Sequence, residues 1–244
     1  MIKVADARAE AEKSARTLTE LIFNRLRVDI LRCRLRPGEK LRVDELRLAY
    51  GGGGSPVREA LSRLSSIGLV RAEGQRGFTV AEVSIPDLLD VTKVRIWVET
   101  TALRHAIRKG DRDWEAEILA AAHRLGAPPI GAPALDPQWE KLHRNFHAAL
   151  VRACGSPRLL SHRELLCDLS DRYRHLSVVT AKTPRDATAE HRAIMEATLA
   201  RNADVACRLL GEHFMETARI VLADALGLGD AAASMISALQ SELL

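Results

Sequence analysis

Four of the eight histidines are spaced so that they could bind one metal ion. His143 and His147 are four residues apart in a segment with helical periodicity, so both rings project from one face of a helix. His191 and His213 fall in two later helical segments. Imidazoles on facing helices of a bundle are good ligands for zinc, nickel, iron or copper, and an open coordination position would accept a carboxylate. Helical histidines are also often surface or hydrogen-bonded residues, and the residues alone leave both interpretations open.

Two further side chains of the same region could contact a small anion. Arg95 lies among apolar residues in a long helical segment, where an unpaired guanidinium would be costly. It either pairs with Glu99 one turn later or holds a carboxylate in a bidentate fork. Tyr173 could donate a hydrogen bond to the same ligand or could simply pack in the core.

A second chemistry, DNA binding, is indicated near the N-terminus. Four consecutive glycines at 51–54 form a corner, after which Ser55 is a favourable N-cap and Pro56 occupies the first helical position. Short strands at 69–73 and 78–82 follow, joined by a glycine-flanked turn with a basic residue. A helix-turn-helix followed by such a hairpin is a winged helix-turn-helix, which places one helix in the major groove. The candidate DNA contacts are Ser55, Val57, Arg58, Arg63, Arg76 and Gly77.

The arginines of this helix also have an ordinary interpretation. Arg58 could pair with Glu59 or Glu45 on a solvated helix face, as surface arginines usually do. For Arg63, helix spacing places it a turn further along, and the residues do not separate a DNA contact from a contact within the domain.

Composition agrees with a DNA-binding end and a neutral remainder. The 244 residues are 47% hydrophobic and 28% charged, a balance typical of globular proteins. Residues 1–82 contain 16 Lys and Arg against 11 Asp and Glu, a net charge of +5, whereas residues 83–244 contain 20 against 21. This asymmetry favours a polyanion bound at one end. The four cysteines lack CxxC spacing, and neither a secretory signal nor an apolar run of about 18 residues is present, so we expect a cytoplasmic protein without a membrane segment.

The rest of the chain predicts helices only. Apolar residues recur with helical spacing from residue 85 to the end, in six or seven segments with mostly short connections. We therefore expect a mainly α protein in three parts: a winged helix-turn-helix with a small β-hairpin wing at 15–82, an antiparallel all-α bundle at 83–228, and a helical tail at 229–244.

The N-terminal motifs resemble those of the GntR family of bacterial transcription regulators. The resemblance rests on LRPGEKL at 35–41, SPVREAL at 55–61, GLV at 68–70 and Arg76-Gly77. It implies a dimeric regulator on a two-fold operator. Many family members place an arginine just before the Pro-Val-Arg-Glu segment, where this chain has glycines and Ser55. One base or phosphate contact of those members is therefore absent here.

The C-terminal two thirds resemble the FCD effector domain of the FadR-type branch. The segments concerned are RIWVE at 95–99, FHAAL at 146–150, EHRAIM at 190–195 and LLGEH at 209–213. The resemblance implies a divalent metal on His147, His191 and His213, beside a carboxylate effector. The usual fourth ligand, an aspartate, is replaced by His143. The segments around 139–147, 153–157 and 172–174 are similar to the carbon-starvation-induced regulator group, which implies a dicarboxylate such as glutarate.

These observations together predict a regulator rather than an enzyme. We expect a homodimeric repressor of a catabolic operon, whose affinity for operator DNA is controlled by a small organic acid near a histidine-bound metal, zinc or nickel. The alternatives are a helical-bundle metalloenzyme with a DNA-binding arm and a constitutive architectural DNA binder. The first lacks an HExxH, a nucleophile elbow or a phosphate loop, and the second does not need so large a bundle.

Overall fold

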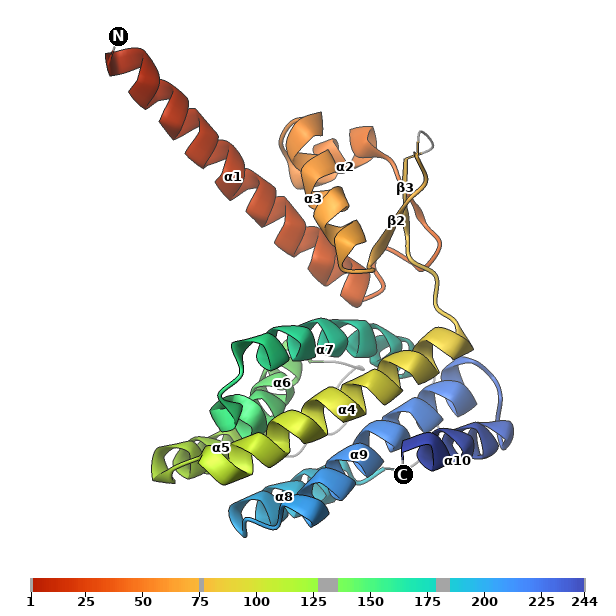
Figure 1. Cartoon of the computed structure of the whole chain (residues 1–244). Helices are drawn as coiled ribbons and strands as arrows, with labels where there is room; N and C mark the ends of the chain where they lie inside the picture. The colour runs from red at the N-terminus through yellow and green to blue at the C-terminus, as the bar shows by residue number, and fades with distance from the viewer. Residues whose placement is uncertain (1, 75–76, 127–135, 179–184, 244) are drawn as a thin grey trace. The chain divides into compact units, whose positions relative to one another are not determined.

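The chain folds into two helical units (Figure 1). The computed structural model describes residues 2–74, 77–126, 136–178 and 185–243. It divides into one unit spanning Met1–Val83 and another spanning Ser84–Leu244. The first unit combines helices with a small sheet and the second is all helical, which confirms the predicted fold class.

The N-terminal unit is a winged helix-turn-helix. Its helices are α1 (Ile2–Leu31), α2 (Val43–Tyr50) and α3 (Gly54–Ser66), and its strands are β1 (Lys40–Leu41), β2 (Val70–Ala72) and β3 (Phe78–Val80). The strands form one antiparallel sheet in the order β1-β3-β2. The wing is thus the predicted hairpin with a third, very short strand added at its edge.

The core of this unit lies between α1 and α3. Apolar residues recur at helical spacing on the facing sides of both helices, and six of them are completely buried: Ile22, Leu26, Ile30, Val57, Leu61 and Leu64. Burial of such side chains stabilises a domain by about 1.5–3 kcal/mol each before entropy is subtracted. The apolar face of α3 therefore packs against α1, and the opposite face of α3 is exposed to solvent.

The start of α3 differs from the sequence prediction. The helix begins at Gly54 with Gly53 as its N-cap, and no side chain caps it. Ser55 is therefore inside the first turn, and the predicted N-cap role is wrong. The turn before it requires a positive φ at two successive positions, 80° at Gly51 and 95° at Gly52, which only glycine adopts at low cost. Only Gly51 and Gly52 therefore form the turn, whereas Gly53 and Gly54 begin the helix as its N-cap and first residue.

The C-terminal unit is a bundle of long helices. In chain order they are α4 (Ile85–Lys109), α5 (Arg112–Leu125), α6 (Pro137–Val151), α7 (Pro157–Val178), α8 (Ala187–Leu199), α9 (Ala203–Ile220) and α10 (Ala231–Leu243). A 3-10 turn at Arg152–Cys154 follows α6, and a π-turn at Val221–Ala225 extends α9. Side chains of Ser84, Asp111, Asp136, Asp186 and Asn202 cap five of the helices.

Helices α4 and α9 run side by side through the middle of this unit (Figure 1). Gly211 on α9 faces α4, and a Cβ added to it would meet Ile96 at an ordinary van der Waals distance of 3.6 Å. The predicted C-terminal tail, α10, belongs to the same unit, because Ala232 and Leu239 are buried and Leu243 packs against the core. None of the described helices has the length and hydropathy needed to cross a membrane.

Substituting Gly52 by alanine should destabilise the N-terminal unit. A Cβ there would lie 3.1 Å from Leu18 and 3.3 Å from Ile22, and the positive φ adds strain of about 1–2 kcal/mol for a residue with a side chain. Gly54→Ala is the matched control, because Gly54 is helical and its Cβ would meet Val43 at an ordinary 3.8 Å. We expect thermal unfolding at a lower temperature for Gly52→Ala alone. Equal midpoints for the two variants would contradict this account of the corner.

Candidate metal centre and DNA-contacting helix

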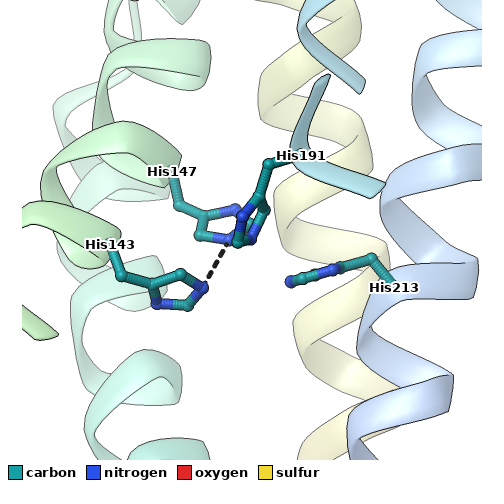
Figure 2. A group of neighbouring side chains, drawn as sticks. All are labelled: His143, His147, His191 and His213. Atoms are coloured by element: carbon teal, nitrogen blue, oxygen red, sulfur yellow. Dashed lines mark hydrogen bonds between the residues drawn. The ribbon is translucent and has the colours of Figure 1, made fainter. Parts of the chain in front are cut away.

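The four predicted histidines converge inside the C-terminal unit (Figure 2). His143 and His147 come from α6, His191 from the first turns of α8, and His213 from the middle of α9. One ring nitrogen from each lies within 4.8 Å of those of the other three. All four side chains are buried, with exposed fractions of 8% or less. The four-residue spacing on α6 brings the first two Nε2 atoms to 3.2 Å.

Several ring nitrogens of this cluster have no hydrogen-bond partner. Nδ1 of His143, Nδ1 of His147 and Nε2 of His191 are buried and have no partner within the described part of the chain. An unpaired buried polar atom costs about 1–3 kcal/mol. A set of four nitrogens that face one another without enough protons to pair is the arrangement that a divalent ion stabilises. The donor set, all imidazole nitrogen, suits zinc, nickel or copper better than magnesium or calcium.

A carboxylate orients the fourth ring. Nδ1 of His213 lies 2.7 Å from a carboxylate oxygen of Glu190, which leaves Nε2 as the ligand atom. Arg185 donates to both oxygens of Glu190 at 2.9 and 2.7 Å and to the hydroxyl of Thr217. A carboxylate behind a metal-binding histidine sets its tautomer and increases its basicity. Glu190 precedes His191 in the sequence, but only the structure assigns it to His213.

Burial keeps the histidines uncharged. Desolvation lowers the pKa of His191 to about 3 and that of His213 to about 4, although Glu190 acts in the opposite direction on both. The pKa values of His143 and His147 are also far below the ordinary value, first because of burial and then because of neighbouring cationic groups. Neutral imidazoles are the form that binds metal. Glu190 stays ionised, because Arg185 and His213 outweigh its burial and lower its pKa to about 2.

Arg95 lies beside the cluster and is paired within the protein. Its guanidinium covers the ring of Phe214 at 4.0 Å, next in sequence to His213, and it lowers the pKa of three of the histidines. Nε lies 3.4 Å from Glu99, and Nη1 donates to Ser170 at 2.8 Å. Of the two interpretations left open by the sequence, the internal pair is thus present. An anion at this guanidinium would compete with Glu99.

Tyr173 anchors one helix to another. Its hydroxyl lies 2.5 Å from a carboxylate oxygen of Asp87 and 3.2 Å from the backbone of Ser84, so it ties α7 to the first turn of α4. Tyr173 and Arg95 line one narrow cavity of about 10 Å³, which has room for a single water at most. Access of a larger ligand to this point requires side chains to move. The role of Tyr173 in effector binding stays a prediction.

Sequence reasoning missed a set of charged pairs that joins α6 to α7. Arg144 donates to Asp171 at 2.9 Å and to Asp168 at 2.8 Å, and both carboxylates are buried. Arg174 of α7 donates to Glu140 of α6 at 2.8 Å. The only available signal was the unusually polar character of the segment 163–175. No spacing rule identifies the partners, because they lie on different helices.

The predicted DNA contacts on α3 fall into different classes. Arg58 and Ser55 are exposed, and Arg58 has no ion pair within the described residues, so the alternative pairing with Glu59 or Glu45 is not seen. Val57 is completely buried, so its side chain belongs to the core of the unit, and its contact with DNA stays a prediction. Arg63 pairs with Glu20 at 2.7 Å.

The other predicted DNA contacts are Arg63 on α3 and the two residues of the wing turn. The guanidinium of Arg63 also covers the ring of Phe23 at 4.2 Å, so its contacts are between α3 and α1. Gly77 has a φ of 103° and closes the wing turn, a conformation suited to glycine. Arg76 lies outside the described residues. The contacts of Arg63 are therefore made within the unit, whereas the side chain of Arg58 is exposed and has no ion pair among the described residues.

Comparison with known proteins agrees with both units. Residues 18–80 match the bacterial regulatory proteins of the gntR family, and residues 90–216 match the FCD domain. The chain is 36% identical over 224 residues to the uncharacterized HTH-type transcriptional regulator BphR of Paraburkholderia xenovorans strain LB400, covering 89% of this chain and 90% of BphR. It is 37% identical over 213 residues to the HTH-type transcriptional repressor GlaR of Escherichia coli strain K12, covering 84% and 96% of the two chains.

A solved structure shows the same fold. Escherichia coli McbR/YncC superimposes with a TM-score of 0.70 at 24% identity, covering 84% of this chain and 97% of McbR/YncC. Fold and sequence together define a transcription regulator with a DNA-binding unit and a helical sensing unit. The chain belongs to the GntR family, in the group that carries an FCD domain. It is a regulator and not an enzyme, which sets the metalloenzyme alternative aside.

The buried histidines predict a steep loss of stability in mild acid for metal-free protein. In the unfolded chain these rings titrate near 6.5, whereas burial keeps them neutral in the fold. Below pH 6.5 the unfolded state therefore binds more protons, and the free energy of unfolding falls by about 1.4 kcal/mol per pH unit for each such histidine. Urea unfolding in chelator at pH 7 and pH 5 measures the effect.

The control is His162→Gln on α7, because His162 is exposed and does not belong to the buried cluster. We expect this variant to keep the full pH dependence of the parent. A free energy of unfolding that is the same at pH 7 and pH 5 would contradict the burial of four neutral imidazoles.

Proposed function

We propose that this GntR-family protein is a repressor whose affinity for operator DNA is set by a small carboxylate bound beside a histidine-held metal. The observation that carries the proposal is the group of four neutral, buried imidazoles, three of them with a nitrogen that has no described partner, adjacent to an arginine. The name of GlaR as a repressor supports the sign of regulation. Its setting would be the cytoplasm, where operator DNA is available.

His143, His147, His191 and His213 would hold the ion, with zinc or nickel as the best match to four nitrogens. When bound, the metal supplies a positive centre that attracts a carboxylate. The protein supplies no anionic ligand here, since His143 stands where an aspartate would reduce the charge. The site therefore keeps the full charge of a divalent ion, which favours an anionic effector.

The effector in this proposal is a small organic acid, a dicarboxylate being one form of it. Arg95 would hold the second end of the ligand, at the cost of its contact with Glu99. Glu99 keeps a second cationic partner, because Nε of Arg163 donates to it at 2.8 Å. When Arg95 turns from Glu99 to the ligand, Glu99 is still paired with Arg163. No unpaired carboxylate is left in the core, so the free-energy cost of releasing Arg95 is small.

DNA binding in this proposal uses the exposed face of α3, with Ser55 and Arg58 toward the major groove and Gly77 in the wing. A two-fold operator is read by a two-fold protein, so we propose a homodimer. Arg63 keeps α3 in place against α1 through Glu20 and does not read a base.

Replacing Arg58 by alanine should weaken operator binding by about 1–3 kcal/mol, the usual value of a side chain that reads a base edge. An electrophoretic mobility shift with the upstream region of the protein's own gene measures it. Arg208→Ala is the matched control, since Arg208 is an equally exposed arginine on α9. Undiminished affinity of a correctly folded Arg58→Ala variant would remove α3 as the recognition helix.

Substitution of His147 or His213 by alanine should abolish metal binding. Elemental analysis of protein purified without a histidine tag or chelator should find about one zinc or nickel per chain in the parent, and X-ray absorption should find nitrogens at about 2.0–2.1 Å. His162→Ala, which removes an exposed histidine, should bind metal as the parent does. If the His147 and His213 variants retain the parent's metal content, these residues are ordinary bundle histidines and the proposal fails.

A further inference from the structure

A second cavity of the C-terminal unit lies apart from the histidines. It is a cleft of about 710 Å³ lined by residues of α5, α6 and α7, and none of the four histidines contributes to it. The volume is within the range of about 300–1,000 Å³ in which small molecules bind. Nothing in the metal site or in DNA binding uses this cleft.

Small side chains on two helices explain why the cleft is open. Ala116 and Ala120 of α5 and Ala148 of α6 face the space and fill little of it. Toward the other end of α6, long charged side chains bridge the gap to α7, as in the pair of Arg144 with Asp168. At the part of the cleft lined by alanines, α5, α6 and α7 leave room for a flat or short apolar group.

A buried arginine, Arg163, lines this space. Arg163 is only 5% exposed, and its Nε is held by Glu99 at 2.8 Å. Its Nη2 is buried and has no hydrogen-bond partner within the described residues. An N–H left without an acceptor in the interior is costly, so a ligand oxygen in the cleft would be stabilised there.

The charged groups at the mouth of the cleft favour an anion overall. Arg124 is exposed and has no ion pair in the described part of the chain, whereas Arg152 is paired with Glu117 at 2.9 Å. Glu164, also exposed, is the one carboxylate of the lining that the structure leaves without a described partner. Arg163 at the wall shares the single carboxylate of Glu99 with Arg95. Counting Arg124 at the mouth, three arginines therefore face two carboxylates, those of Glu99 and Glu164.

We propose that this cleft is a second ligand site, which binds an organic carboxylate with a compact apolar body. The carboxylate would accept from Arg163 and Arg124, and the apolar body would lie on the alanines of α5 and α6. Glu99, the partner of Arg163, is also the partner of Arg95, so the two sites share one fully buried carboxylate. Occupancy of the cleft is independent of any metal on the histidines.

Benzoate is the probe, with benzamide as its uncharged counterpart. Isothermal titration calorimetry of the full chain in EDTA should show saturable benzoate binding at about millimolar affinity or tighter, and no binding of benzamide. Ala148→Leu, which fills the cleft from an exposed helical position, should weaken benzoate binding at least about tenfold. Ala233→Leu, on the exposed face of α10, is the matched control and should bind benzoate as the parent does.

Charge variants at the mouth test the recognition itself. Arg124→Gln should weaken benzoate binding and Glu164→Gln should strengthen it, each several-fold, without affecting folding because both residues are exposed. Absence of saturable binding, or binding that Ala148→Leu leaves unchanged, overturns the proposal. Benzoate binding that appears only after metal is added, and that Ala148→Leu does not affect, assigns the anion to the histidines and leaves the function proposed above intact.

Discussion

The sensing unit depends on removing four imidazoles from water without charging them. The rings of Phe146, Phe214 and Trp139 pack around the histidines at centroid distances of 5.1–5.6 Å and exclude solvent. Desolvation then outweighs every other influence on their pKa values, so the nitrogens keep their lone pairs in mild acid. Burial of unpaired imidazole nitrogens costs free energy, and an ion bound to them would offset that cost and couple the fold to its own binding.

Close packing of α4 on α9 places an arginine next to this cluster. Ile96 of α4 lies next to Gly211 of α9, and Arg95, one residue earlier on α4, covers the ring of Phe214. The buried carboxylate of Glu99 then neutralises Arg95 from one side and Arg163 from the other. Glu99 of α4 is therefore in contact with one arginine beside the histidine cluster and with another that lines the cleft on α5 and α6.

In the DNA-binding unit too, an arginine is available to an external ligand only when no residue of the fold already pairs with it. Arg63 is held by Glu20 and Phe23, so it contributes to the packing of α3 on α1. Arg58, five residues earlier and on the outward face, has no described ion pair. The net positive charge of the N-terminal third therefore does not by itself identify the residues that contact DNA. The basic residues that have no ion pair within the unit are the better candidates.

The sequence by itself determined the winged helix-turn-helix followed by an all-helical bundle, and the four histidines on three helices, because periodicity and four-residue spacing are local properties. It did not determine the N-terminus of α3, where backbone torsion angles and not the capping preference of Ser55 decide the first helical residue. Nor could it separate Arg58 from Arg63, or assign Glu190 to His213. Those contacts join residues that are far apart in the chain or on different helices. Only the packing of one helix against another, which sets distance and burial together, decides them.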